Sequence, residues 1–104
     1  MRILLGCLPA ELAIELYGHE VSTVQQAGWA GLKNGELLER ASDHFEILLT
    51  IDKRVEREYK LPINLALVTV RARSNRIQDL LPLVPELLRA VNEAKGGAST
   101  TVGN

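Results

Sequence analysis

Short apolar runs alternate with segments of helical periodicity along this chain. Four runs rich in aliphatic or β-branched residues predict strands, at residues 3–5, 19–24, 45–51 and 65–72. The run at 45–51 is almost entirely apolar, which is typical of a strand covered on both faces in the middle of a sheet.

Between these runs the apolar positions recur at helical spacing. Leu8, Leu12 and Leu16 predict a helix that begins near Pro9 and ends at Gly18. Asn34 can cap a second helix over residues 35–42, and the charged stretch 53–60 predicts a short exposed helix. The strongest pattern predicts a last helix, which is formed by Ile77, Leu80, Leu81, Val84, Leu87, Leu88 and Val91.

Two prolines interrupt this last pattern. Pro82 and Pro85 each remove a backbone donor, so we expect a bend, or a short turn followed by a main helix starting near Pro85. Residues 96–104 are small and polar and are expected to fray. The sequence therefore predicts one domain over residues 1–95 and a flexible tail over 96–104.

The alternation of strands and helices predicts the fold class. It favours an α/β three-layer sandwich with a mainly parallel four-stranded sheet and helices on both faces. In such sheets ligands bind beyond the carboxyl ends of the strands, at the point where the strand order reverses. Candidate site residues are therefore those that follow each strand.

Composition narrows the class of protein without assigning a function. The 104 residues include 12 basic and 13 acidic side chains, so the net charge of −1 gives no overall attraction to nucleic acid or membrane. An aromatic content of 4% argues against a base-stacking platform. The single cysteine excludes an internal disulfide, and no apolar run approaches a bilayer span or a signal peptide. We therefore expect a cytoplasmic protein without membrane association.

Two acidic residues are candidates for chemistry. Asp52 ends the buried third strand, where a carboxylate can bind a divalent metal or can cap the helix that follows. Glu36 lies in the first turn of the second helix, where it can serve as a second metal ligand or simply stabilise the helix dipole.

Basic and polar residues at the same predicted edge are candidates for binding phosphate. Ordinary surface charge is the competing interpretation of this set, which comprises Lys33, Lys53, Arg54, Arg71, Arg73, Ser74, Asn75 and Arg76. Cys7 follows the first strand, while His19 and His44 are predicted at the opposite edge. A Cys–His catalytic pair is thus disfavoured, and Cys7 is expected to be a small buried apolar residue.

Several segments together resemble a known family. They are Met1–Leu5 with Leu8-Pro9, Gly18-His19-Glu20-Val21, Gly28 to Leu38, Leu48 to Lys53 and Val70 to Arg76. In this order they resemble small bacterial PIN-like proteins, which are distant relatives of the VapC toxins. The resemblance covers about residues 1–94, and its most specific part is Gly-Leu-Lys-Asn-Gly-Glu-Leu-Leu at 31–38.

The resemblance implies a PIN-like fold and a Mg²⁺- or Mn²⁺-dependent ribonuclease that belongs to a toxin–antitoxin pair. Its partners would be RNA, a helix-turn-helix antitoxin and a second copy in a homodimer. Clustered carboxylates hold the metal ions in such enzymes, and Asp52 and Glu36 match two of the acidic positions.

The chain departs from the family at one place. The family's first strand normally ends in Asp-Glu, and Gly6-Cys7 stands there instead. Two hypotheses follow: a ribonuclease toxin with impaired hydrolysis, or a catalytically inactive PIN-like module that dimerises or binds an antitoxin. A flavodoxin-like small-ligand domain is a third interpretation, against which the absence of a phosphate-binding glycine loop counts.

Overall fold

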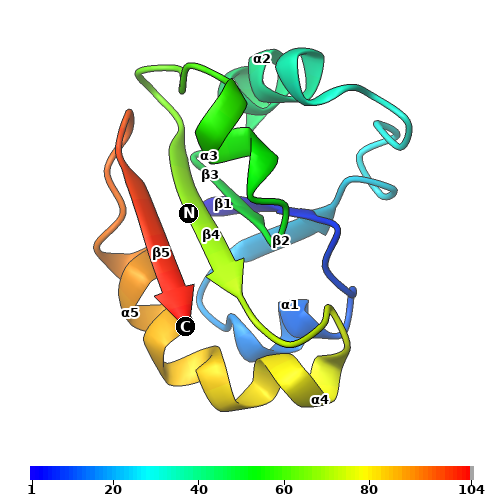
Figure 1. Cartoon of the computed structure of the whole chain (residues 1–104), viewed down its shortest axis with the longest axis vertical. Coiled ribbons are helices and arrows are strands. Elements are labelled where there is room, and N and C mark those ends of the chain that lie inside the picture. The colour runs from blue at the N-terminus through cyan, green and yellow to red at the C-terminus, as the bar shows by residue number, and fades with distance from the viewer. Residues whose placement is uncertain (104) are drawn as a thin grey trace.

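The computed structural model describes residues 1–103 and shows one sheet flanked by helices on both faces (Figure 1). Its strands are β1 (Arg2–Gly6), β2 (Glu20–Thr23), β3 (Ile47–Thr50), β4 (Ala66–Arg71) and β5 (Ser99–Gly103). Its α-helices are α1 (Leu12–Glu15), α2 (Asn34–His44), α3 (Arg54–Glu58), α4 (Ile77–Leu80) and α5 (Val84–Asn92). A 3₁₀ turn, η1 (Leu81–Leu83), joins α4 to α5.

The sheet is entirely parallel, in the order β2-β1-β3-β4-β5. This confirms the predicted α/β class with its parallel sheet, but the sheet has five strands and not four. The order is that of flavodoxin-like doubly wound sheets. The chain leaves β1 toward β2 on one side and then crosses to β3 on the other, so the strand order reverses between β1 and β3.

The fifth strand overturns the expectation of a frayed tail at 96–104 as far as Gly103, and Asn104 lies outside the described residues. Residues 99–103 pair with β4 along its length, from Leu67 opposite Ser99 to Arg71 opposite Gly103. Val102 is buried to 1% exposure on the face covered by α5. A single apolar side chain and the ladder to β4 are enough to order this segment, although its composition is polar.

Apolar side chains fill both faces of the sheet. One core lies under α1, α4 and α5 and includes Leu5, Leu49, Val68, Leu87 and Val91. The second lies under α2 and α3 and is smaller; it consists of Leu4, Leu37, Leu38, Ala41, Leu48, Val55, Leu65 and Leu67. Both layers follow from strand alternation, because successive residues such as Leu48 and Leu49 face opposite sides.

The helices correct two local expectations and confirm a third. α1 has only four residues, and Pro9 lies in the turn before it. Lys33, not Asn34, stands at the N-cap of α2, with no side-chain capping bond. The prolines act as predicted: α4 ends at Leu80, η1 contains Pro82, and the main helix α5 begins at Val84.

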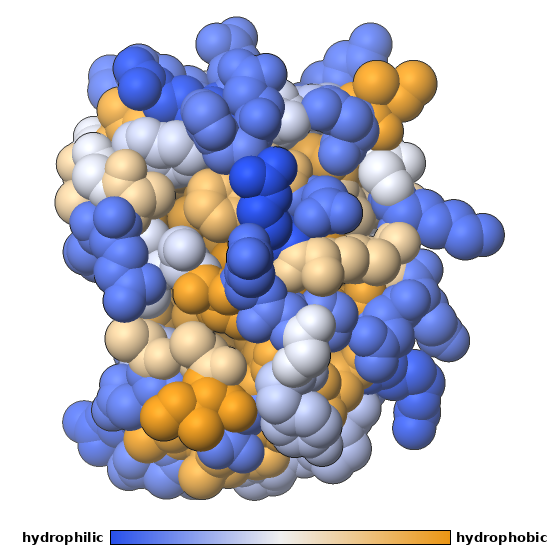
Figure 2. Space-filling model, turned by 180° about the vertical axis from the view of Figure 1, so that it is seen from behind, coloured by the Kyte–Doolittle hydropathy of each residue, from blue (hydrophilic) through white to orange (hydrophobic). Residues whose placement is uncertain are grey.

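The surface opposite the viewer of Figure 1 mixes charged side chains with apolar ones (Figure 2). Among large apolar residues, Ile14 and Tyr17 on and after α1 are 77% and 74% exposed. Within residues 1–103, none of the helices has the length and apolar character needed to cross a bilayer.

Candidate functional site

A cavity of about 200 Å³ lies at the carboxyl ends of β1 and β3, where the strand order reverses. It is lined by Gly6 and Cys7 after β1, by Thr50 and Asp52 at the end of β3, and by Trp29 and Asn34 from the segment before and at the start of α2. The complete lining is Gly6, Cys7, Val24, Gln25, Trp29, Ala30, Gly31, Leu32, Asn34, Leu37, Leu48, Thr50, Asp52 and Val55. The position agrees with the general location of ligand sites in parallel sheets.

A wider hollow, of about 530 Å³, lies at the other edge of the sheet. It is lined by the strand starts and by the turn before β2, namely Met1, Arg2, Gly18, His19, Glu20 and Glu46. This hollow is shallow, and it lies at the amino ends of the strands, away from the edge at which parallel sheets bind ligands. We therefore take the smaller and more enclosed cavity as the candidate site.

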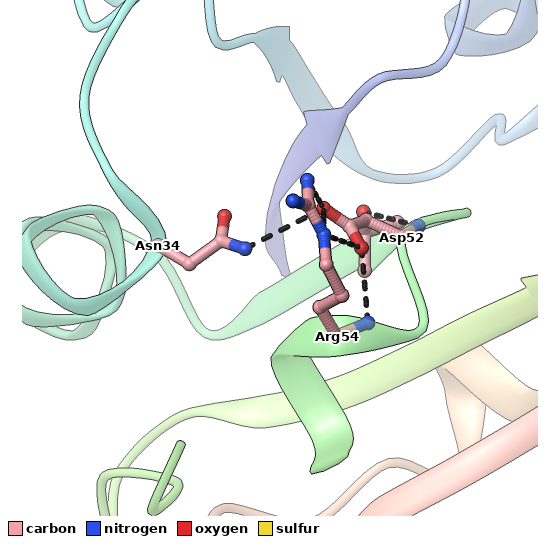
Figure 3. A network of polar contacts seen from close by, with 4 residues as sticks. Asn34, Asp52 and Arg54 are labelled. Carbon is pink, nitrogen blue, oxygen red and sulfur yellow. Dashed lines mark hydrogen bonds and ion pairs between the residues drawn. The ribbon is translucent and has the colours of Figure 1, made fainter. Parts of the chain in front are cut away.

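Asp52 is the central charged group of this cavity, and Arg54 holds it (Figure 3). The Arg54 side chain donates to both carboxylate oxygens, from Nε at 3.0 and 3.2 Å and from a terminal nitrogen at 2.8 Å. The Arg54 backbone N–H donates to Asp52 Oδ1 at 2.9 Å, and Asn34 Nδ2 approaches Oδ2 at 3.4 Å. The Asp52 side chain is 15% exposed, whereas that of Arg54 is 71% exposed.

These contacts lower the pKa of Asp52 to about 2 from an ordinary value of 3.8. The side-chain hydrogen bond from Arg54 is the largest cause, and it outweighs the burial that opposes ionisation. The backbone contact also ties Asp52 to the start of α3, although Lys53 and not Asp52 stands at the N-cap of that helix.

The lowered pKa predicts how stability depends on pH. Because the folded pKa lies below the ordinary one, ionised Asp52 stabilises the fold above about pH 4, and this contribution is lost as pH falls toward 2. We expect Asp52→Asn to cost about 1 kcal/mol at pH 6, a figure reduced by solvent screening of the exposed Arg54. Urea unfolding of both proteins between pH 6 and 2.5 checks this; a cost that stays constant over that range contradicts it.

The second carboxylate candidate lies elsewhere. Glu36 is on the exposed face of α2, outside the cavity lining, and approaches Arg40 one turn later at 3.4 Å. The buried residues Leu37, Leu38 and Ala41 occupy the other face of that helix. The helix phase thus points Glu36 to solvent, and the structure does not bring it to the cavity with Asp52.

The residues present do not fit a Mg²⁺ or Mn²⁺ site. Within residues 1–103, no three His, Cys, Asp or Glu side chains are grouped so as to hold a metal ion. Asp52 is the one carboxylate in the cavity lining, and the guanidinium of Arg54 already satisfies both of its oxygens. A hard divalent cation prefers about six oxygen ligands, and this donor set supplies few of them.

Gly6 and Cys7 occupy the place where the resembled family has acidic residues. Gly6 is buried beside Thr50, whose Oγ1 would lie 3.3 Å from a Cβ at position 6. Cys7 is exposed, so the expectation of a buried apolar cysteine is wrong. The reason is its left-handed backbone, with φ of 59°, which turns the chain away from the sheet at this residue.

The predicted phosphate-binding residues fall into separate groups. Lys33 and Arg54 line a hollow of about 250 Å³ next to the cavity, which it joins through Leu32 and Asn34. Arg76 and Asn75 line another, of about 460 Å³, which joins the cavity on its other side through Cys7 and Gln25. The three hollows adjoin one another along the carboxyl edge of the sheet through these shared lining residues, and they are here together called the edge groove.

The remaining candidates lie off the edge groove or are used inside the fold. Arg71 and Arg73 line a different hollow with Asp79, and Lys53 is exposed at the start of α3. The Ser74 hydroxyl donates to Asp79 at 2.6 Å and accepts from the Arg76 N–H. The Asn75 amide donates to the Cys7 carbonyl at 3.2 Å, which ties the loop after β4 to the end of β1.

Two features of the site were not predicted from the sequence. Trp29 lines the cavity, and its ring lies 5.7 Å from that of His44 and 5.8 Å, edge to face, from that of Phe45. The multiple hydrogen bonds between the Arg54 guanidinium and the Asp52 carboxylate were also not predicted, although an arginine two residues after an aspartate at a helix start is a pattern that could have indicated them.

Comparison with protein-family models, curated proteins and solved structures gives no match.

Proposed function

We propose that this chain is a PIN-like component of a toxin–antitoxin pair in which metal-dependent RNA hydrolysis is impaired and the edge groove binds single-stranded RNA. The observation that supports impairment is the state of Asp52, a single carboxylate already neutralised by Arg54. The PIN-like assignment is supported by the ordered segments that resemble that family. The flavodoxin-like strand order does not decide between functions, because one fold serves many.

The charges of the edge groove support binding of a polyanion. Arg76 lines one end together with the acidic Glu11, and Lys33 lines the other, where Arg54 is already paired with Asp52. Between them Trp29 lines the wall, and an aromatic ring can stack on a nucleotide base. The net charge of −1 does not oppose this, since the positive groups are local and phosphate contacts act over short distances in salt.

The alternative within the same fold is a module that binds a helix-turn-helix antitoxin and no RNA. The exposed apolar residues Ile14 and Tyr17 would suit a protein partner better than a nucleic acid. This alternative predicts that RNA affinity is absent while the antitoxin still binds.

RNA binding by the edge groove is tested by paired charge removals. We expect Lys33→Ala and Arg76→Ala each to weaken binding of a labelled single-stranded RNA in fluorescence anisotropy. Each should also flatten the slope of log K against log salt by about 0.7, the value for one lost phosphate contact. Arg89→Ala removes the same charge from the exposed face of α5 and should change neither quantity.

Hydrolysis is tested by incubating the same RNA with the protein and Mn²⁺. We expect no cleavage above that seen with the Asp52→Asn variant. Cleavage that requires Asp52 would contradict the impairment, and equal RNA affinity of all three charge variants would contradict the groove.

A further inference from the structure

The two edges of the sheet differ in how they are protected. At the β2 edge the Thr23 N–H donates to Gln26 Oε1 at 2.8 Å, and the Gln26 N–H donates back to Thr23 Oγ1 at 3.0 Å. The charged Glu20 begins that strand. A backbone N–H that is already hydrogen-bonded cannot pair with another strand, and a charged side chain also discourages such pairing at a sheet edge.

The β5 edge is less protected over Ser99–Gly103, where the contact of this kind is the long one from the Gly103 N–H to Glu86 Oε2 at 3.5 Å. The segment Ser-Thr-Thr-Val-Gly contains no charged residue and no proline, and β-branched residues make up most of it. Weakly protected strands of this kind are templates for pairing with another strand.

The hydrogen-bond alternation shows which groups of β5 are open. The Leu67 N–H donates to the Ala98 carbonyl, so residues 98, 100 and 102 direct their backbone groups toward β4. Ser99, Thr101 and Gly103 then direct theirs to the open side. Of these, the Gly103 N–H has a distant side-chain acceptor, Glu86 Oε2 at 3.5 Å.

From this asymmetry we infer that β5 pairs antiparallel with β5 of a second copy of this chain, in a twofold arrangement centred on Thr101. Ser99 of one copy then lies opposite Gly103 of the other, and the two threonines at 101 exchange their N–H···O bonds. The two sheets become one sheet of ten strands.

Charges at the two ends of β5 are complementary in this arrangement. Lys95 lies just before the strand, where its carbonyl accepts from the Ala98 N–H, and it is exposed. Glu86 lies at the other end, beside Gly103. Antiparallel pairing brings the start of one β5 to the end of the other, so Glu86 of each copy approaches Lys95 of its partner. A parallel arrangement would place like charges together, which costs energy.

The inference is independent of the proposed function, since it uses no residue of the edge groove. The test is sedimentation equilibrium of the full chain from micromolar to several hundred micromolar. We expect a reversible dimer, and a Thr101→Pro variant whose dissociation constant is at least about tenfold larger. Proline at this position removes an N–H that faces outward, so the monomer should keep its circular dichroism spectrum and unfolding temperature.

Charge reversal distinguishes this interface from any other. We expect Glu86→Lys and Lys95→Glu each to weaken the dimer, and the double reversal to restore it within about threefold of the original chain. The inference is overturned if the original chain is monomeric over the whole range, if Thr101→Pro dimerises equally well, or if the double reversal is weaker than both single ones. Dimers that survive Thr101→Pro would place the interface elsewhere.

Discussion

Replacing Val102 with aspartate is expected to lower the free energy of unfolding by about 4 kcal/mol. The side chain is 1% exposed among the core residues under α5, so the change removes buried apolar surface and puts a carboxylate in its place. Loss of this anchor should also release β5 from β4. Urea unfolding followed by circular dichroism gives the value.

Thr100→Asp provides the matched control for that experiment. Thr100 belongs to the same strand but is exposed, so the same new charge should change stability by less than about 0.5 kcal/mol. Equal effects at 100 and 102 would mean that residues 96–104 are the frayed tail that their composition indicates.

Mn²⁺ binding is expected to appear when a carboxylate is added at position 6 and the guanidinium is removed at position 54. Gly6 faces Thr50 across the β1–β3 ladder and lines the same cavity as Asp52. An aspartate fits there with a shift of a few tenths of an ångström, because its Cβ would lie 3.3 Å from Thr50 Oγ1. In Gly6→Asp with Arg54→Gln, two carboxylates are then free to bind one cation.

Calorimetric titration measures the Mn²⁺ affinity of each variant. For the original chain we expect no heat of Mn²⁺ binding at millimolar concentration, and for the double variant a dissociation constant on the order of 1 mM, the weak end for divalent-cation sites. Gly6→Asn with Arg54→Gln has nearly the same shape without the new charge and should not bind. The single variant Arg54→Gln shows how much of the Mn²⁺ binding comes from removing the guanidinium and how much from the new carboxylate.

Tight Mn²⁺ binding by the original chain would contradict this expectation. It would mean that Arg54 swings away from Asp52 to admit the metal, and that the ribonuclease site is intact. Unfolding temperatures of all variants show whether each one is folded before its titration is interpreted.

The fold was largely predictable because its strongest patterns are local. The aliphatic runs fix β1, β3 and β4, and the helical spacing up to Val91 fixes α5. The prolines at 82 and 85 even predict where that helix restarts. These signals depend on side chains close in sequence, so no knowledge of the tertiary structure was needed.

The fifth strand was missed for a physical reason. Only Val102 of β5 enters the core, so apolar content is low, and the strand is ordered by its ladder to β4 far away in sequence. The signal that could have found it is the β-branched run Thr100-Thr101-Val102, which favours a strand even where polarity favours a tail.

The position of the site in the sheet was predictable, but which residues lie next to Asp52 in it was not. Asp52 lies where the end of a central strand predicts it, because parallel topology brings carboxyl ends together. The solvent-facing position of Glu36 follows from the helix phase that Leu37, Leu38 and Ala41 define, and that pattern was available in the sequence. The left-handed backbone of Cys7 was not available, since non-glycine residues with positive φ have no reliable sequence signal.

Trp29 gives the cavity its own spectroscopic reporter. It is the sole tryptophan of the chain; it lines the candidate site, and its ring is within 6 Å of the rings of His44 (5.7 Å) and Phe45 (5.8 Å). Indole emission from this protein therefore arises at the cavity wall alone, free of any background from the rest of the molecule. A nucleotide or metal entering between Trp29 and Asp52 can thus be followed in real time without attaching a dye.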